Sequence, residues 1–395
     1  MNYHFSDRIS GLQPSAVREI LKFTADPTVI SFAAGNPAAE AFPVQDIAAI
    51  SAEILEKTPI AALQYSITEG YPALREATAA FACRKEQNIH EGDQLMITSG
   101  GQQGIDLATK VLCNEGDVVI CEDPSFIGAL NTFRSYHVRL VGVTMDEDGM
   151  NLAALEQALK NNPKARLIYT IPSFQNPSGI TTSAEKRREI YRLAVQYGVM
   201  VLEDNPYGDL RFAGEPVPTI KSLDTQGAVI YLGSFSKILS PGIRVGYVIA
   251  PAPVISKMAV GKQCSDVHTT IWAQMVCERY MTTRNMEEHL ERLRGLYRHK
   301  CALMLDEIAR EFAPSVQVTR PEGGLFIWAT LPQGVDMMDF CRRAVERKVA
   351  VVPGTAFCAD ESAASSSFRL NFSTPADEKI VQGIRVLGEL TRQLV

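Results

Sequence analysis

This sequence lacks a surplus of positive charge. Its 395 residues carry 39 lysines and arginines against 45 aspartates and glutamates, a formal net charge of −6. Nucleic acids and anionic membranes are bound by clustered basic side chains, so the charge balance argues against both kinds of partner. No apolar run approaches the roughly 20 residues of a membrane helix, and residues 1–10 are too polar for a secretory signal. We therefore expect a cytoplasmic protein with no nucleic-acid or membrane partner.

The sequence also lacks metal-binding and redox spacings. Its eight cysteines are scattered, with no Cys-x-x-Cys pair and no Cys/His cluster at zinc-ligand spacing. We expect free thiols and no metal site. There is no internal repeat, no low-complexity tract and no long flexible linker, and residues 361–367 are the best candidate for a mobile loop.

The length and the alternation of apolar segments indicate the fold class. At 395 residues the chain exceeds what one hydrophobic core usually serves, so a large and a small domain are expected. Short β-branched runs alternate with helical segments from about residue 94. Strands that are apolar on both faces predict an α/β domain with a mostly parallel, doubly wound sheet. The expected strands span 95–98, 117–121, 138–143, 167–171, 199–202, 229–232 and 245–249, and the clearest helix spans 183–197.

The pattern changes after a long helical stretch at 286–312. Strand pairs with helices to one side predict a small α+β domain. Its expected strands span 316–319, 325–330 and 368–372, and its expected helices span 337–347 and 376–394. We predict an N-terminal segment, 1–45, that joins this small domain, a large domain at 46–285 and the small domain at 286–395.

A lysine on a loop is the strongest chemical signal. Residues 234–237, Ser-Phe-Ser-Lys, follow one expected strand and precede another, so the loop presents the amine of Lys237 at a sheet edge. A lysine amine attacks an aldehyde only when it is neutral. Two further segments lie upstream: Asn-Pro-Ser-Gly at 176–179 and Asp-Asn-Pro-Tyr at 204–207. Each motif alone is a common turn, and the order and spacing of all three make the signal specific.

Together these three segments resemble the cofactor site of the pyridoxal-phosphate aminotransferases of fold type I, class I/II. The resemblance covers essentially the whole chain. It implies pyridoxal 5'-phosphate as the cofactor, small-molecule amino acids and 2-oxo acids as substrates, and a homodimer with shared active sites. The large domain would bind the cofactor.

The resemblance also implies a role for each residue around the ring of the cofactor. Lys237 would form the imine with the cofactor and move the α-proton of the substrate. Asp204 would pair with the pyridine nitrogen and keep it protonated. Tyr207 and Asn176 would bind the phenolic oxygen, and Phe126 would stack on the ring. Many relatives carry tyrosine at this last position, and phenylalanine keeps the stacking without the hydroxyl.

The phosphate of the cofactor needs backbone donors and cations. The Gly-rich segment 99–104 follows a strand and opens a helix, so the amides of Gly101 and Gln102 can bind an anion. The family usually places a serine where this chain has Gly101, so backbone donors must suffice there. The hydroxyls of Ser234 and Ser236 and the guanidinium of Arg244 would complete the site. In the family, a segment like 64–66 reaches the phosphate of the neighbouring subunit, which assigns Tyr65 to that contact.

Substrate recognition is expected to use arginine, because a guanidinium matches a carboxylate with two parallel hydrogen bonds. By resemblance, Arg369 binds the α-carboxylate, with Asn176 and Gly35 beside it. The stretches 11–20 and 30–37 are similar to the subgroup of 2-aminoadipate, kynurenine and broad-range aminotransferases, in which an N-terminal helix covers the site. Arg18 lies where that subgroup can hold an arginine for a distal carboxylate. It could equally be an exposed helix arginine.

Three other functions are compatible with parts of the sequence. A serine acylase could use Ser234 with Lys237, but the Ser-Asp-Asn and Lys-Thr-Gly motifs that it needs are absent from the sequence. A β-eliminating lyase or a decarboxylase with the same cofactor stays open, because the same electron sink serves all three reactions. A regulatory module would carry a winged-helix DNA-binding domain, and no basic recognition helix is evident. The sequence therefore predicts an aminotransferase, with a lyase or decarboxylase as the alternative.

Overall fold

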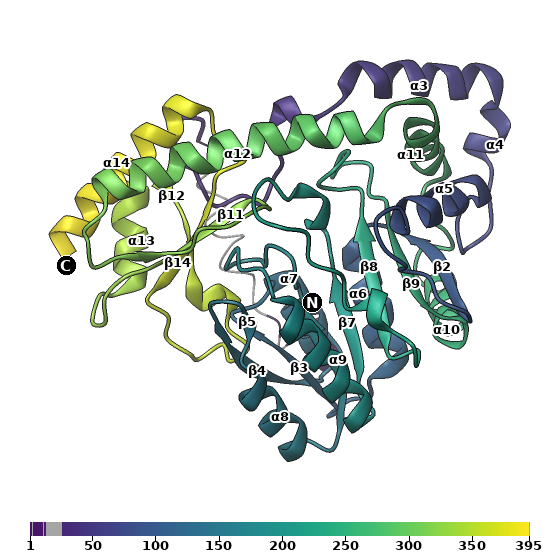
Figure 1. The fold of residues 1–395 in the computed structure, drawn as a ribbon, viewed down its shortest axis with the longest axis horizontal. Helices are drawn as coiled ribbons and strands as arrows, with labels where there is room; N and C mark the ends of the chain where they lie inside the picture. Colours follow the sequence, from purple (N-terminus) through teal and green to yellow (C-terminus); the bar gives the residue numbers. More distant parts are fainter. Residues whose placement is uncertain (2, 11, 13–25, 395) are drawn as a thin grey trace.

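An eight-stranded sheet forms the centre of the computed structural model, which describes residues 1, 3–10, 12 and 26–394 (Figure 1). Most neighbouring strands run parallel, whereas β9 pairs antiparallel with both of its neighbours and β5 pairs antiparallel with β4. The prediction of a mostly parallel sheet is confirmed. In spatial order the strands are β2 (Asp93–Thr98), β9 (Gly246–Pro251), β8 (Val229–Ser234), β7 (Met200–Asp204), β6 (Ala165–Thr170), β3 (Val118–Asp123), β4 (Arg139–Asp146) and β5 (Gly149–Met150).

Alternate residues of the central strands face opposite hydrophobic layers. In β3, Val118 and Ile120 pack in the layer that contains residues of α8 and α9, whereas Val119 and Cys121 pack in the layer that contains residues of α6, α7, α10 and α11. This explains why the strands are apolar on both faces. The helices of this part are α5 (Pro72–Ala82), α6 (Gly101–Leu112), α7 (Ile127–Ser135), α8 (Leu152–Asn161), α9 (Ala184–Tyr197), α10 (Ala252–Gln263) and α11 (Ile271–Thr283), with 3-10 turns η2 (Gly208–Leu210) and η3 (Lys221–Leu223).

A second, smaller sheet lies beside the first one (Figure 1). Its order is β10-β11-β14-β13, all pairs are antiparallel, and α14 packs along α12. Residue Ile30 of the N-terminal part pairs with Val349 in a separate parallel ladder, β1 with β12. The elements of this part are β1 (Ile30–Ser31), β10 (Gln317–Val318), β11 (Phe326–Thr330), β12 (Val349–Ala350), β13 (Val352–Pro353), β14 (Ser367–Asn371), α12 (Met286–Glu311), α13 (Met337–Glu346), α14 (Asp377–Leu394) and η4 (Gly354–Phe357).

The remaining helices precede the large sheet in the sequence. They are α1 (Asp7–Ser10), α3 (Val44–Lys57) and α4 (Pro59–Leu63), with the 3-10 turn η1 (Ala39–Ala41). Helix α3 packs against α11 at the end of the molecule that lies far from α14 (Figure 1). Among the described residues, no helix has both the length and the hydrophobicity of a membrane span.

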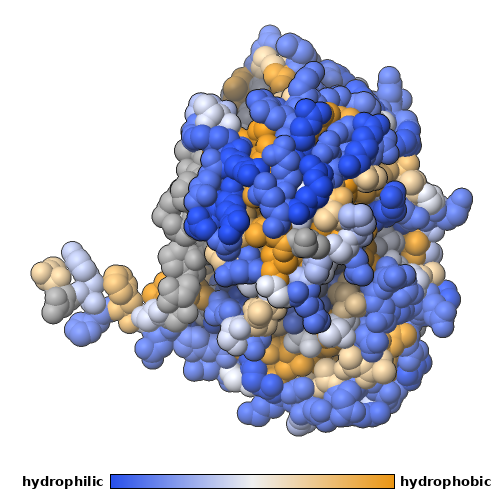
Figure 2. All heavy atoms as spheres, turned by 90° about the vertical axis from the view of Figure 1, so that its left-hand side faces the viewer, coloured by the Kyte–Doolittle hydropathy of each residue, from blue (hydrophilic) through white to orange (hydrophobic). Residues whose placement is uncertain are grey.

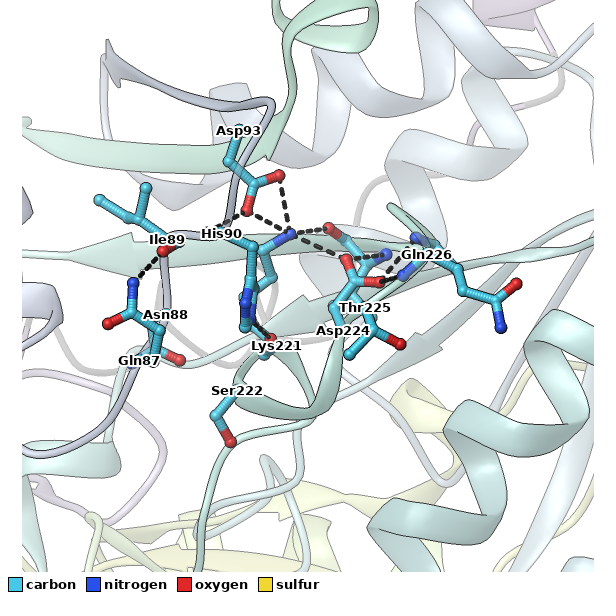
Figure 3. A network of polar contacts seen from close by, with 12 residues as sticks. Gln87, Asn88, Ile89, His90, Asp93, Lys221, Ser222, Asp224, Thr225 and Gln226 are labelled. Carbon is cyan, nitrogen blue, oxygen red and sulfur yellow. Dashed lines mark hydrogen bonds and ion pairs between the residues drawn. The ribbon is translucent and has the colours of Figure 1, made fainter.

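A buried ion triad connects the starts of two strands (Figure 3). Nζ of Lys221 lies 2.9 Å from a carboxylate oxygen of Asp93, which begins β2, and 2.9 Å from one of Asp224. It also donates to the carbonyl of Val229, the first residue of β8. The three charged side chains are almost completely removed from solvent, where a charge is tolerated only when it is paired. The triad lies at the opposite end of β8 from Ser234, so we assign it a structural role.

Candidate active site

A cavity of about 320 Å³ opens where β7 and β8 end. Asp204 is the last residue of β7 and Ser234 the last of β8, and ligands of α/β sheets bind at such carboxyl ends. Larger surface clefts exist elsewhere, but this one brings a lysine, a buried carboxylate and two arginines together. Twelve of the predicted site residues line it: Gly35, Gly101, Gln102, Phe126, Asn176, Asp204, Tyr207, Ser234, Ser236, Lys237, Arg244 and Arg369.

Lys237 enters this cavity from the loop after β8. Its Nζ donates a 2.8 Å hydrogen bond to the carbonyl oxygen of Gly35. Burial, together with the positive charges of Arg369 and Arg244, lowers the pKa of Lys237 from 10.5 to about 8. A much larger fraction of this amine is therefore neutral near pH 7 than of an exposed lysine, as a nucleophile requires.

Asp204 is held by a residue that the sequence analysis missed. The hydroxyl of Tyr169, on the neighbouring strand β6, donates a 2.8 Å hydrogen bond to Oδ2 of Asp204. Burial raises the pKa of Asp204 to about 6, and the Tyr169 hydrogen bond opposes this shift. The carboxylate is thus ionised at neutral pH in a site where a cationic partner would stabilise it further.

Tyr207, Asn176 and Arg369 lie together on another wall. Oδ1 of Asn176 accepts a 2.7 Å hydrogen bond from Nη1 of Arg369, whose Nη2 donates to the carbonyl of Ala33 at 2.7 Å. Burial raises the pKa of Tyr207, while the charge of Arg369 and a hydrogen bond with Asn176 oppose the shift. The guanidinium also lies over the ring of Phe326, at 4.3 Å from its centroid.

Arg369 is a buried cation with spare hydrogen-bonding capacity. It is only 4% exposed, so it does not face solvent from β14. Burial lowers its pKa to about 10, and it remains charged at neutral pH. Its Nε is buried and has no hydrogen-bond partner. Because buried donors are normally satisfied, this group indicates an anionic ligand such as a carboxylate.

Another part of the cavity has the features of an anion site. Helix α6 begins at Gly101, directly after Gly100, whose φ is +81°. A Cβ on Gly100 would lie 2.5 Å from Nη2 of Arg244, so only glycine lets the guanidinium approach the helix start this closely. The backbone N–H of Ser236 donates to Oγ of Ser234 at 3.1 Å. Helix amides, hydroxyls and a guanidinium around one space suit a phosphate group.

Two lining residues, Gln102 and Phe126, lie against α7. Nε2 of Gln102 donates to the carbonyl of Gly128 and to the hydroxyl of Thr132, so its side chain is committed to α7 and its backbone N–H remains for an anion. Phe126 directly precedes α7. A Cβ on Gly128 would lie 2.5 Å from Cζ of Phe126, so this glycine makes room for the ring.

Tyr65 does not line this cavity. Tyr65 is 81% exposed and packs edge-to-face with His268 at 5.8 Å between ring centroids. Arg18 lies outside the described residues. Gly35 does line the cavity, and a Cβ there would lie 3.3 Å from the ring of Phe326.

The cavity fits the predicted cofactor. The space between the start of α6 and Arg244 suits the phosphate. Asp204 suits a protonated ring nitrogen, and the unsatisfied Nε of Arg369 suits a substrate carboxylate. The fold and this site define a pyridoxal-phosphate-dependent transferase of fold type I.

Comparison with known proteins identifies the family. The family described as "Aminotransferase class I and II" matches residues 27–387, and the chain belongs to it. The chain is 40% identical to "Aromatic-amino-acid aminotransferase 1" of Thermococcus litoralis, over 99% of this chain and 94% of that protein. It is 39% identical to "2-aminoadipate transaminase" of Thermus thermophilus, over 97% and 95% of the two chains. The predictions of family, enzyme class and cofactor are confirmed.

A solved structure agrees with this assignment. The α-aminoadipate aminotransferase from Thermus thermophilus, complexed with N-(5'-phosphopyridoxyl)-L-leucine, is 38% identical to this chain and superposes with a TM-score of 0.90. The match covers 99% of this chain and 97% of that one.

Proposed function

We propose that this enzyme transfers the amino group of L-amino acids of the 2-aminoadipate, aromatic or branched-chain type to a 2-oxo acid such as 2-oxoglutarate, in two half-reactions. The observation that carries the proposal is the presence of Lys237 and Arg369 in one cavity. An amine that acts at the α-carbon and a guanidinium for the α-carboxylate suit the part that all α-amino acids share. The names of the two relatives support aromatic and aminoadipate substrates.

The cofactor, when bound, supplies an electron sink for the substrate α-carbon. Asp204 would hold the proton on the ring nitrogen, since an ionised buried carboxylate favours a cation beside it. Tyr207 and Asn176 would bind the phenolic oxygen. Arg369 would orient the substrate by its carboxylate, and Nζ of Lys237, once neutral, would accept the proton from the substrate α-carbon. The phosphate would be held by Gly101, Gln102, Ser234, Ser236 and Arg244.

The cavity walls bear on the choice of substrate. Among the described residues that line it, the cations are Lys237, Arg244 and Arg369, and each has a role at the cofactor or the α-carboxylate. For a distal carboxylate we propose Arg18, which lies outside the described residues, on the resemblance to the subgroup alone. The apolar lining residues suit aromatic and branched side chains: Ala33, Ala34, Ile105, Ile127, Ile171 and Phe326.

We further propose a homodimer with shared sites. Exposed large apolar side chains gather along α3, α4 and the loop that follows, at Val44, Leu55, Ile60, Leu63, Tyr65 and Ile67. Figure 2 shows the opposite, small-domain side of the molecule, where hydrophilic side chains cover much of the upper part and apolar atoms appear in narrow bands. A cluster of exposed apolar residues supports an interface with a second copy, in which Tyr65 would reach the partner's phosphate site.

The domain limits and the location in the cell are also proposals. The pairing of Ile30 with Val349 supports joining segment 1–45 to the domain at 286–395, and the start of α12 at Met286 supports the division from 46–285. All eight cysteines are free thiols, which supports a reducing cytoplasm.

A donor screen tests the proposed function. The purified dimer with cofactor would be given 2-oxoglutarate and, in parallel, 2-aminoadipate, phenylalanine, kynurenine and leucine. Formation of glutamate together with the oxo acid of the donor supports transfer. Ammonia or carbon dioxide in stoichiometric yield without glutamate would contradict it.

A further inference from the structure

Glu122 is a fully buried carboxylate with no place in the chemistry above. It lies on β3 and accepts three hydrogen bonds: from the hydroxyl of Thr170, from the backbone N–H of Ile171 at 3.1 Å and from Nε2 of Gln175 at 3.0 Å. Side chains alternate along a strand, so Tyr169 meets Asp204 while its neighbour Thr170 meets Glu122. Glu122 therefore lies behind the catalytic face of the sheet.

The contact with Gln175 connects this carboxylate to two loops of the active site. Nε2 of Gln175 donates a second hydrogen bond, of 2.7 Å, to the carbonyl of Pro124 in the loop that carries Phe126. Oε1 of Gln175 accepts from the backbone N–H of Ser178 at 2.8 Å and from its hydroxyl at 2.7 Å, which closes the turn that carries Asn176. The side-chain amide of Gln175 is thus hydrogen-bonded to both loops, and Glu122 is hydrogen-bonded to that amide.

We propose that Glu122 is a positioning residue which, through Gln175, fixes the loops of Phe126 and Asn176 against the cofactor. The proposal rests on the function proposed above, because it takes Phe126 and Asn176 as cofactor contacts. An amide that rotates freely could satisfy only one loop at a time. Glu122 prevents this by accepting from the same Nε2 that reaches Pro124.

The hydrogen bonds show which property of Glu122 is required. Burial raises the pKa of Glu122 to about 7, an effect that the hydrogen bonds from Thr170, Ile171 and Gln175 oppose and the charge of Asp204 supports. If the carboxyl is protonated on Oε1, the hydroxyl of Thr170 can turn and accept, while Oε2 still accepts from Ile171 and Gln175. An acceptor at Oε2 is needed, and the negative charge is not. Glutamine can supply the same pattern, with its amide nitrogen toward Thr170.

Glu203 offers a matched control. It is equally buried, lies on the neighbouring strand β7 in register with Thr170, and burial raises its pKa to about 7 as well. Its hydrogen bonds come from the backbone N–H groups of Ile220 at 2.9 Å and Lys221 at 2.7 Å. Neither of these residues lines the active-site cavity. Replacement of Glu203 should therefore show how much stability the protein loses when a buried carboxylate outside the active site is removed.

The test compares Glu122→Leu, Glu122→Gln, Glu203→Leu and Gln175→Met in the full-length protein. The dissociation constant of pyridoxal phosphate would be measured by equilibrium dialysis, together with the melting temperature and kcat/KM. Glu122→Leu and Glu203→Leu should lower the melting temperature alike. Only Glu122→Leu and Gln175→Met should weaken cofactor binding, by about tenfold or more, since each leaves a buried loop donor unsatisfied. Glu122→Gln should stay within about twofold of wild type.

Two outcomes would overturn the proposal. One is cofactor binding in Gln175→Met and Glu122→Leu that equals that of Glu203→Leu, and the other is a loss in Glu122→Gln as large as in Glu122→Leu. Gln175→Met keeps the test valid if Glu122→Leu does not fold. Failure of the proposed function is recognised separately, because wild-type protein would then bind no cofactor or transfer no amino group.

Discussion

The carboxamide oxygen of Asn176 and the guanidinium of Arg369 are joined by a hydrogen bond of 2.7 Å. Asn176 follows β6 of the large sheet, whereas Arg369 lies on β14 of the small one. The bond therefore crosses between the two sheets and connects the proposed cofactor contact with the proposed substrate contact. Loss of either side chain leaves the buried polar group of the other one without its partner.

The pH dependence of covalent cofactor uptake should reveal the lowered pKa of Lys237. Because the amine is neutral above its pKa of about 8, the rate at which apoprotein takes up pyridoxal phosphate covalently should rise with pH through about 8 and then level off. An ordinary lysine would continue to gain rate toward pH 10.5. Borohydride reduction followed by peptide mapping measures the labelled fraction at each pH. Reduced cofactor on another lysine would contradict the assignment. The Lys237→Ala variant should still bind the cofactor, but borohydride should not fix the cofactor to it and it should not transfer amino groups.

Asp204→Asn should keep the fold and lose at least about a hundredfold in kcat, because a neutral amide cannot stabilise a protonated ring nitrogen. Tyr169→Phe is a milder variant, because it removes only a hydrogen bond to Asp204 and keeps the carboxylate. The Tyr169 hydroxyl favours the ionised form of Asp204, so its loss should raise the pKa of Asp204 further above 6 and move the acid limb of kcat/KM to higher pH. Near-normal turnover of Asp204→Asn with saturating cofactor would refute the role.

Substitution of Arg369 should affect all amino-acid substrates alike, whereas substitution of Arg18 should affect only substrates with a distal carboxylate. Arg369→Lys should lower kcat/KM for leucine, phenylalanine and 2-aminoadipate alike, since all share the α-carboxylate. Arg18→Ala should lower the ratio of kcat/KM for 2-aminoadipate over leucine by about ten- to a hundredfold, the worth of a lost charge-assisted hydrogen bond. An unchanged ratio would remove Arg18 from the substrate site.

Mixed dimers test the sharing of sites. Tyr65→Ala and Lys237→Ala dimers should each have little activity. After the subunits are mixed and exchanged, a hybrid dimer has one site with both residues intact, so a one-to-one mixture should regain about a quarter of wild-type activity. The assay is transamination before and after exchange. No recovery in the mixture would mean that Tyr65 acts within its own chain, and full activity of the Tyr65→Ala dimer by itself would mean that Tyr65 has no role at the site.

Removal of the buried lysine should destabilise the large sheet. Lys221→Met leaves the carboxylates of Asp93 and Asp224 buried without their cation, and the free energy of unfolding should fall by about 3–5 kcal/mol. Lys57→Ala is the control, because it removes an exposed i,i+4 pair with Glu53 and should leave denaturation unchanged. Equal denaturation curves for the two variants would contradict a structural role for the triad.

Sequence alone predicted the residues that lie at strand ends and in turns. Lys237 and Asp204 are predicted because each lies in a short contiguous motif, and the order and spacing of these motifs resemble those of a known family. Tyr169 and Glu122 were missed because their importance depends on the register between β3, β6 and β7, which no single segment reveals. The side-chain direction of Gln102 was likewise hidden, since its partners on α7 lie 26 and 30 positions away.

The triad around Lys221 limits the paths by which this sequence can diverge. Replacement of Lys221 alone leaves two buried carboxylates without a cation, whereas replacement of all three members by apolar residues of similar volume is often neutral. An intermediate that has lost the lysine first would therefore be less stable than either end point. Among diverging descendants, the lysine should not be lost before its aspartates.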